Sequence, residues 1–282
     1  MRIGFIGAGL MGHGMVLNLL KCSHEVHVIA HRNRVPIEDL LSRGACEAGS
    51  LDSIAHTSEC IVLCLSSSRI VEETIAALRP GLRLGQIIID AGTSEPESTR
   101  RLAGELAALG VAYADAPMTG GPEQAAAAEL GVLCGASPET FATILPLLSC
   151  YASTIRHVGP VGSGHAAKLI SNFLVTGMIA LVAQAFGAAR RADIDWRSLY
   201  AVMLNGSGNS GVLRKMVAPA LEGDLEGYRF SLNNAAKDIG YFKALASGLG
   251  LETSLADAVA EVFSAAMAQG HGQKNVSHLL NL

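Results

Sequence analysis

The sequence lacks the features that mark several classes of protein. Its six cysteines include no C-x-x-C pair, which argues against a zinc site and a disulfide framework and favours a reduced, cytoplasmic compartment. The nine histidines do not converge in a metal-ligand pattern, so no metal is predicted. Lysine and arginine number 21 against 25 acidic residues, a net charge of −4. Without a clustered basic excess, we expect no nucleic-acid partner.

Apolar material, by contrast, is plentiful. The chain has 282 residues, of which 50% are hydrophobic and 16% charged, and its mean hydropathy is +0.35. This composition excludes a disordered chain, and the length favours two domains. Cys60 and Cys64 lie within an apolar run and are interpreted as small core residues.

Two apolar stretches have the length of a targeting or membrane segment. Residues 3–20 are interrupted by glycines and end without an A-x-A cleavage site, so no signal peptide is predicted. Residues 169–189 are long enough to cross a bilayer, but they contain Asn172, Thr176 and Gln184. A lone spanning helix would leave these polar groups in hydrocarbon. We therefore favour a helix buried in a soluble fold, and expect no membrane association.

The first half of the chain alternates short apolar runs with helical stretches. The apolar runs are residues 2–6, 25–30, 60–65, 86–90 and 111–114. The helical stretches are residues 10–22, 36–43, 69–78 and 94–109. This alternation is typical of a doubly wound parallel sheet. Ser94 is expected to be the N-cap of the last of these helices, with Pro96 in its first turn.

The second half changes character near Gly159-Pro160, after which β-branched runs end and long helical periodicities begin. These cover residues 162–191, 196–205, 209–221, 231–249 and 254–269. We therefore predict an α/β protein with an N-terminal Rossmann-type doubly wound sheet over residues 1–160 and an all-α domain over residues 161–282.

A glycine loop joins the first predicted strand to the first predicted helix. Residues Gly7-Ala8-Gly9-Leu10-Met11-Gly12 form the pattern G-x-G-x-x-G. In this context the three glycines allow a tight turn, the approach of a pyrophosphate and close helix–strand packing. The helix N-terminus then offers N–H groups to the phosphates. A simple tight turn is the alternative, but the position favours dinucleotide binding, with Leu10 and Met11 also at the cofactor.

The end of the second predicted strand indicates which dinucleotide binds. A carboxylate there would bond the ribose 2′-hydroxyl of NAD. The sequence instead has Arg32 and Arg34, and no carboxylate before Glu38. The two arginines suit a 2′-phosphate, although a solvated basic loop is the ordinary alternative. NADP is therefore favoured, and NAD stays open.

Two further segments carry groups suited to a substrate and a proton. In Asp115-Ala116-Pro117-Met118-Thr119-Gly120-Gly121, the glycines after Thr119 can present backbone N–H groups to a carboxylate, although an ordinary loop is the alternative. Lys168 and Asn172 lie four residues apart, on one face of the long predicted helix. Their presence in an apolar helix indicates a cleft; a surface lysine is the alternative for Lys168.

Taken together, these motifs resemble those of the β-hydroxyacid dehydrogenases, which include 3-hydroxyisobutyrate dehydrogenase and tartronate semialdehyde reductase and are related to 6-phosphogluconate dehydrogenase. The resemblance covers essentially the whole chain. Its four motifs occur in the family's order: Gly4-Phe5-Ile6-Gly7-x-Gly9-x-Met11-Gly12, the segment Asp115–Gly121, Gly162-x-Gly164-x-x-x-Lys168-x-x-x-Asn172, and Phe230-x-Leu232 followed by Lys237-Asp238.

The resemblance implies an NAD(P)-dependent oxidoreductase that acts on a small 3-hydroxy acid or its semialdehyde. Lys168 would be the general acid/base, and the substrate would be held by Thr119, Gly120, Gly121, Asn172 and Phe230. Besides the glycine loop, the residues at the cofactor would be Arg32, Arg34, Leu65, Ser66, Thr93 and Lys237. The all-α domain would bind substrate and form a homo-oligomer, a dimer or a tetramer.

Several residues depart from the family pattern and leave the substrate open. Thr119 replaces a serine, Ser171 an asparagine, Ser66 a proline, and Gly14 stands where proline is common. Two other functions stay open: an imine or ketone reductase acting on a substrate without a carboxylate, and a dinucleotide-binding regulator without turnover. Relatives that reduce imines usually lack the lysine, so Lys168 argues against the first.

The remaining polar and aromatic residues are interpreted as structural. His165, one turn before Lys168, is expected to be a helix-surface histidine, and His13 a surface or packing group. Trp196 is expected to pack within the helical domain. Asp90 ends a predicted strand and is interpreted as a structural residue.

Overall fold

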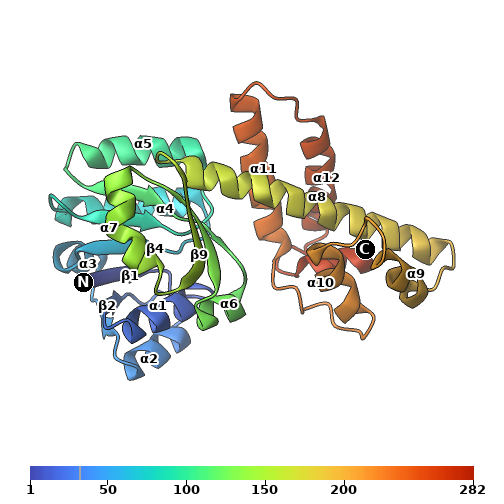
Figure 1. Ribbon diagram of the computed structural model, residues 1–282, viewed down its shortest axis with the longest axis horizontal. Helices are drawn as coiled ribbons and strands as arrows, with labels where there is room; N and C mark the ends of the chain where they lie inside the picture. Colours follow the sequence, from blue (N-terminus) through green and yellow to red (C-terminus); the bar gives the residue numbers. More distant parts are fainter. Residues whose placement is uncertain (32) are drawn as a thin grey trace. The chain divides into compact units, whose positions relative to one another are not determined.

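The computed structural model describes residues 1–31 and 33–282 (Figure 1). Within this part of the chain there are two compact units, Met1–Lys168 and Leu169–Leu282. Each unit has hydrophobic clusters of its own. The predicted fold class, a doubly wound α/β sheet followed by an all-α segment, is confirmed.

The first unit is built on a mostly parallel sheet. Its strands in the described residues are β1 (Arg2–Ile6), β2 (Glu25–Val28), β3 (Cys46–Glu47), β4 (Cys60–Leu63), β5 (Ile87–Asp90), β6 (Ala112–Asp115), β7 (Met118–Thr119), β8 (Leu130–Gly135) and β9 (Ala152–Gly159). Their spatial order is β3-β2-β1-β4-β5-β6-β8-β7, and β9 pairs with β8. Strands β1 to β6 pair in parallel, whereas β8 is antiparallel to β6 and β7. The strand order reverses at β1, between β2 and β4, which is where open α/β sheets bind ligands.

Helices cover both faces of this sheet. One hydrophobic cluster takes in α1 (Gly12–Lys21), α2 (Val35–Ser42), α6 (Pro122–Ala127) and α7 (Pro138–Leu148). The other takes in α3 (Leu51–Thr57), α4 (Ser68–Leu78) and α5 (Pro96–Ala107), with the short 3-10 helix η1 (Arg79–Gly81) after α4. Alternate residues of β4 serve the two clusters: Cys60 and Val62 face the first, Ile61 and Leu63 the second. Burial on both faces explains why the parallel strands are continuous apolar runs.

The second unit is helical. Helix α8 (Ser163–Arg191) leads into it, followed by α9 (Trp196–Met203), α10 (Gly211–Ala220), α11 (Leu232–Gly248), α12 (Ser254–Ala268) and the 3-10 helix η2 (Val276–Asn281). Side-chain oxygens of Asp195, Ser210 and Ser231 accept N–H bonds in the first turns of α9, α10 and α11, which explains where these helices begin. Trp196 packs edge-on against the buried Phe186, with ring centroids 5.2 Å apart, so its predicted packing role is confirmed.

Helix α8 is long and apolar enough, by length and composition, to cross a membrane, and 39% of its most apolar window is buried in the protein. The expectation of a buried helix holds for one side only. Asn172 and Thr176 are buried, and the Thr176 hydroxyl donates to the Asn172 carbonyl at 2.9 Å. Ile170, Leu174 and Leu181 are instead 55%, 66% and 68% exposed.

The structure differs from the sequence-based expectation in several local features. Several elements of the first unit were not predicted, namely strands β3, β7, β8 and β9 and helices α3, α6 and α7. Strand β9 lacks an apolar pattern because most of its side chains are exposed or half-buried. The assignment of Ser94 as an N-cap was wrong. The cap position is Glu95, and the Ser94 hydroxyl donates to Asp90 Oδ2 at 2.8 Å, which ties the loop back to the strand.

Candidate active site

The loops that follow β1, β4 and β5 lie against one another at the carboxyl edge of the sheet. Gly7 has a φ of +102°, and a Cβ there would lie 2.2 Å from the Cys64 carbonyl oxygen. A Cβ at Gly92 would lie 2.8 Å from the Leu65 carbonyl oxygen. Only glycine allows these approaches. They bring the segments of Leu65, Ser66 and Thr93, all predicted at the cofactor, next to the glycine loop.

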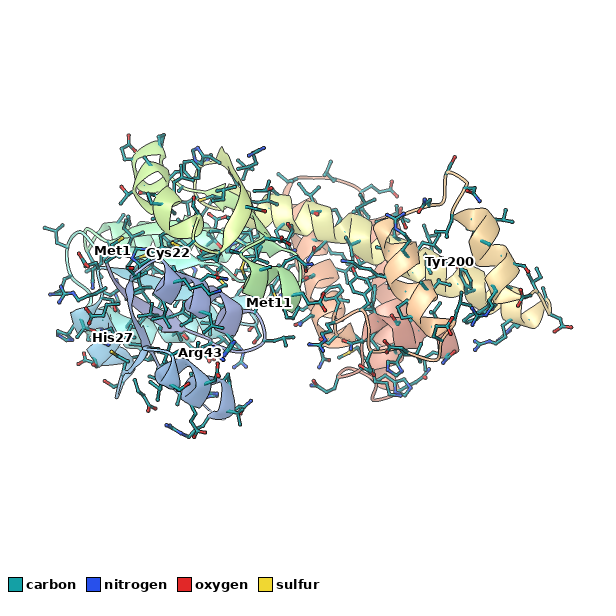
Figure 2. The ribbon with its side chains drawn as sticks, turned by 60° about the horizontal axis from the view of Figure 1, so that its bottom comes forward. Met1, Met11, Cys22, His27, Arg43 and Tyr200 are labelled. Carbon is teal, nitrogen blue, oxygen red and sulfur yellow. The ribbon has the colours of Figure 1, made fainter. Side chains whose placement is uncertain are left out.

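The glycine loop itself has the shape that a pyrophosphate requires. A Cβ at Gly12 would meet the Gly7 carbonyl oxygen at 2.2 Å, which shows how closely α1 approaches β1. A Cβ at Gly9 would meet no atom within 4 Å among the described residues other than its chain neighbours, so these residues leave the space beside it open. Helix α1 begins after Met11 (labelled in Figure 2) without a side-chain cap and without an acidic residue in its first turn. Its positive end is therefore suited to an anion. Leu10 is 63% exposed on the same loop.

The basic loop after β2 has a carboxylate partner on β3, which is distant from it in the sequence. The Arg34 guanidinium donates to both oxygens of Glu47, at 2.9 and 3.1 Å, and lies 3.6 Å from Glu38. Glu47 reaches Arg34 because β3 pairs with β2 and places Glu47 opposite Val28. Hydrogen bonding to Arg34 holds the pKa of Glu47 below its ordinary value. Arg32, the other predicted phosphate-binding residue, lies outside the described residues.

The predicted substrate loop follows β6. Thr119 ends β7, and its hydroxyl lies 3.4 Å from the Gly131 carbonyl oxygen. Gly120 has a φ of +115°, a conformation that favours glycine. The Gly121 N–H donates to Gln124 Oε1 at 2.9 Å, an interaction that the sequence did not predict. A substrate carboxylate at the Gly121 N–H would take the place of this amide oxygen.

The start of α8 is fastened to the end of β6. Asp115 is fully buried and accepts two backbone N–H bonds of 2.7 Å, from Gly162 to Oδ1 and from His165 to Oδ2. Burial raises the pKa of Asp115, while the His165 charge and these N–H bonds oppose the rise. Lys168 follows one turn later and is half-buried. The expectation of a helix-surface histidine at 165 was wrong, because its exposure is 0%.

In the second unit, Asp238 links two of the predicted site residues. The Asn172 amide donates to Asp238 Oδ2 at 2.6 Å, and Lys237 Nζ lies 2.7 Å from Asp238 Oδ1. Lys237 also lies over the Tyr241 ring, 4.8 Å from its centroid. Phe230 is half-buried and packs against the helical core. Because the Asp238 carboxylate can only accept from the Asn172 amide nitrogen, it fixes the direction of that amide, whose oxygen points away from Asp238.

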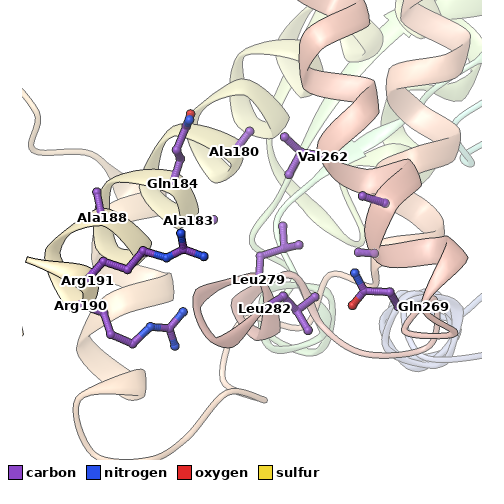
Figure 3. Close-up of a pocket in the computed structure, with 13 residues that line it drawn as sticks. Ala180, Ala183, Gln184, Ala188, Arg190, Arg191, Val262, Gln269, Leu279 and Leu282 are labelled. Atoms are coloured by element: carbon purple, nitrogen blue, oxygen red, sulfur yellow. The ribbon is translucent and has the colours of Figure 1, made fainter.

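Other parts of the described chain add little to this set. A cavity of about 550 Å³ in the helical unit (Figure 3) is lined by residues of α8, α12 and the C-terminal segment, including Arg190, Arg191 and Gln269. None of the predicted site residues lines it. No group of three or more His, Cys, Asp or Glu side chains in the described residues is arranged to hold a metal ion. Burial raises the pKa of the Cys60 and Cys64 thiols to about 12, in keeping with packing roles.

Comparison with known proteins gives matches along the whole chain. A family model for the NAD binding domain of 6-phosphogluconate dehydrogenase matches residues 2–159, and one for the NAD-binding region of NADP-dependent 3-hydroxyisobutyrate dehydrogenase matches residues 162–282.

Individual relatives agree with this result. The chain is 30% identical to 3-hydroxyisobutyrate dehydrogenase of Pseudomonas aeruginosa, covering 98% of this chain and 94% of the relative. It is 28% identical to 2-(hydroxymethyl)glutarate dehydrogenase of Eubacterium barkeri, covering 100% and 94%. The crystal structure of a 3-hydroxyisobutyrate dehydrogenase from Salmonella typhimurium is 26% identical and superposes with a TM-score of 0.89, over 100% of this chain and 99% of the other.

Proposed function

As a member of the β-hydroxyacid dehydrogenase family, this chain is an NAD(P)-dependent hydroxyacid dehydrogenase, and we propose that Lys168 is its general acid/base. The substrate class is a small 3-hydroxy acid or its semialdehyde. One observation carries the proposal. Lys168 lies one turn beyond the point where Asp115 fastens α8 to the carboxyl edge of the sheet, the edge that also bears the glycine loop.

When it is bound, NADP(H) would accept the hydride in oxidation and donate it in reduction, and the glycine loop is suited to hold it. The open space at Gly9 and the uncapped start of α1 fit a pyrophosphate. Leu65, Ser66, Thr93 and the residues from Leu10 to Gly12 border the same edge and are proposed to complete the cofactor site, with Lys237 from the second unit. Arg34 and Arg32 are proposed to select the 2′-phosphate, which would compete with Glu47 for the Arg34 guanidinium.

The chain's own contribution to the reaction is to hold one carboxylate and to move one proton. The loop Thr119–Gly121 is proposed to hold the substrate carboxylate, and Asn172 and Phe230 to hold the remainder. In oxidation, Lys168 Nζ would accept the proton of the substrate hydroxyl, and in reduction it would return a proton to that oxygen. Its ammonium form also stabilises negative charge that develops on the oxygen. Asp238 orients the Asn172 amide for this task.

The setting of the enzyme is proposed on the same basis. We infer a soluble, cytoplasmic homo-oligomer in which residues 1–160 bind the cofactor and residues 161–282 bind substrate and form the subunit interface. The exposed apolar side chains of α8 support a subunit interface on that helix. The buried polar side chains of Asn172 and Thr176 support the inference that α8 packs within a protein and does not cross a membrane.

Steady-state kinetics test this proposal directly. We expect turnover with NADP, and weaker turnover with NAD, on a panel of 3-hydroxy acids and semialdehydes. Matched ketones and imines without a carboxylate should be poor substrates. Activity that is indifferent to the carboxylate would favour an imine or ketone reductase, and no turnover with any compound would favour a regulator.

Substitution of Lys168 tests its role. Lys168→Ala should lower kcat by about 10²- to 10⁴-fold, the usual worth of a positioned acid/base, while the Kd for NADP changes little. Lys168→Arg keeps the charge but should not restore kcat, because a guanidinium does not release its proton. Lys274→Ala, at an exposed lysine of the second unit, is the matched control. Near-normal turnover in Lys168→Ala would refute the assignment.

A further inference from the structure

His165 lies in a fully buried polar cluster in the first unit. Its Nδ1 is 2.7 Å from Thr99 Oγ1 and 3.9 Å from Asp115 Oδ2, and its Nε2 is 3.6 Å from Asp90 Oδ2. His165, Asp90 and Asp115 have an exposure of 0%, and Thr99 of 1%. A histidine between two buried carboxylates is a costly arrangement that requires a specific pairing of charges.

The direction of the hydrogen bonds defines which ring nitrogens carry protons. We assign the single proton of the Thr99 hydroxyl to the Glu95 carbonyl, which can only accept and lies 3.0 Å away, so that Thr99 Oγ1 accepts from His165 Nδ1–H at 2.7 Å. Nε2 therefore faces Asp90 Oδ2. No described residue forms a hydrogen bond with Nε2, and 3.6 Å is an ionic rather than a hydrogen-bonded distance. A bare lone pair at Nε2 would be repelled by a carboxylate, whereas an N–H would be attracted.

Asp90 has the contacts of an ionised carboxylate. Its Oδ1 accepts from the Gly92 N–H at 2.9 Å, and its Oδ2 accepts from the Ser94 hydroxyl at 2.8 Å and from the Tyr113 hydroxyl at 3.4 Å. Asp115 likewise accepts two backbone N–H bonds. Both carboxylates act only as acceptors in these contacts, which is the pattern of an ionised group, and both face the His165 ring, with the Tyr113 hydroxyl beside them. A doubly protonated ring offsets one of these two charges.

The cluster joins the starts of three segments that carry predicted site residues. Asp90 holds the loop that contains Thr93. Asp115 begins the segment that leads to Thr119. The His165 N–H and ring belong to the first turns of α8, one turn before Lys168. The side chain of His165 is thus the element of α8 that touches both strand ends.

We propose that His165 is a positioning residue that, as an imidazolium between Asp90 and Asp115, holds Lys168 in register with the cofactor and substrate loops. This inference rests on the proposed function for the role of Lys168. His165 itself has no exposed surface at which a substrate could bind. Its effect reaches the reaction through the backbone of α8, whose first turns it fixes to the ends of β5 and β6.

Nitrogen NMR of the wild-type holoenzyme tests the charge state without turnover. We expect both ring nitrogens of His165 to show the chemical shifts of a protonated imidazolium at pH 7. In Asp90→Asn, which keeps the size of the side chain and removes the charge, the Nε2 proton should be lost. A neutral His165 ring in the wild-type protein at pH 7 would overturn the proposal.

Kinetics test the positioning role. His165→Gln, which can still donate to Thr99 but carries no charge, should lower kcat at least tenfold and leave the Kd for NADP within about threefold. Asp90→Asn should have a similar effect, and the double variant should be no slower than the slower single variant, because both remove one interaction. Wild-type kcat in His165→Gln, or additive losses in the double variant, would refute the proposal.

The matched control lies at the other end of the same strand. Gln86 is a buried polar residue just before β5, and it ties Ala55, Ser58 and Arg83 together through hydrogen bonds of 2.5 to 2.7 Å. Gln86→Leu should lower the thermal stability and leave kcat unchanged at a temperature where the protein is folded. An equal loss of kcat in this variant would show that any buried polar change has the same effect, and would overturn the proposal. Failure of the wild-type enzyme to turn over any panel compound would refute the proposed function instead, and the NMR result would still decide the charge of His165.

Discussion

At the scale of single residues, the glycines of the first loop separate the needs of the fold from the needs of the ligand. Gly12 is required by the protein, since a Cβ there would lie 2.2 Å from the Gly7 carbonyl oxygen and 2.8 Å from the Phe5 ring. Gly9 is not, since beyond its chain neighbours no atom in the described part of the protein lies within 4 Å of a Cβ at that position. The sequence motif alone treats both glycines alike.

Gly9→Ala and Gly12→Ala should therefore fail in different ways. Gly9→Ala should keep the stability of the wild type and raise the Kd for NADP about tenfold or more, because the new methyl group occupies the space of the pyrophosphate. Gly12→Ala should lower the free energy of unfolding by about 1–3 kcal/mol, through overpacking. Urea unfolding and fluorescence titration with NADPH measure the two effects. If Gly9→Ala binds NADP with the affinity of the wild type, the dinucleotide does not bind at this loop.

The Arg34–Glu47 pair is the residue-scale feature that bears on NADP against NAD. Arg34→Ala should raise the Kd for NADP about tenfold and leave that for NAD unchanged, because only NADP has a 2′-phosphate for the guanidinium. Glu47→Gln should tighten NADP binding, since the guanidinium is then released to the phosphate. Arg43→Ala, at an exposed arginine paired with Asp39, is the control. If all three variants bind both dinucleotides as the wild type does, Arg34 does not select the cofactor.

At the scale of elements, α1 and α6 approach each other closely enough to dictate small residues. A Cβ at Gly14 would lie 2.7 Å from the Ala126 nitrogen and 2.8 Å from the Ala125 carbonyl carbon. The buried Asn18 amide donates to the carbonyls of Ala125 and Ala126, at 2.8 and 3.2 Å. This contact explains glycine at position 14. It also fixes α6, the helix that follows the predicted substrate loop.

Gly14→Ala should lower the free energy of unfolding by about 1–3 kcal/mol, because backbone atoms of α6 cannot yield as a flexible side chain would. Gly104→Ala is the matched control, and it should change the free energy of unfolding in the opposite direction. Gly104 is exposed within α5, and a Cβ there would meet no described atom outside the helix backbone within 4 Å, so alanine should stabilise the protein by about 0.4–1 kcal/mol. Urea unfolding of both variants decides the matter. Equal stability of Gly14→Ala and the wild type would mean that α6 is free to shift.

At the scale of the whole molecule, α8 raises the question of what covers its apolar side. Ile170, Leu174 and Leu181 are spaced at i, i+4 and i+11, so they lie on one face of the helix, and each is more than half exposed. A contiguous apolar face of this kind marks an interaction surface. We expect a second copy of the chain to cover it.

Replacing both Leu174 and Leu181 by Glu should convert the oligomer to monomers, because each interface would then bury uncompensated charges. Sedimentation velocity should show a dimer or larger species for the wild type and a monomer for the double variant. Leu84→Glu, at an 84% exposed leucine of the first unit, should leave the oligomer intact. A monomeric wild-type protein, or one that associates with lipid vesicles through this face, would contradict this expectation.

The sequence by itself determined the class of fold and the order of the motifs. Parallel strands buried on both faces must be apolar runs, and α-helices must repeat their apolar residues every third or fourth position. For this reason β1, β4, β5 and helices α8 to α12 were predicted to within a few residues. The glycine loop was recognised as a candidate dinucleotide site because a predicted strand precedes it and a predicted helix follows it. Short or exposed elements such as β3 and β9 have neither pattern and were missed.

Only the tertiary structure decided which polar residues meet. Glu47 reaches Arg34 through strand pairing, and Asp90, Asp115 and Thr99 surround His165 from three separate segments. Local periodicity indicates whether a residue faces an interior, but it did not reveal the buried position of His165 at the start of α8. The partners of a buried polar group come from distant parts of the chain, and so no local pattern contains them.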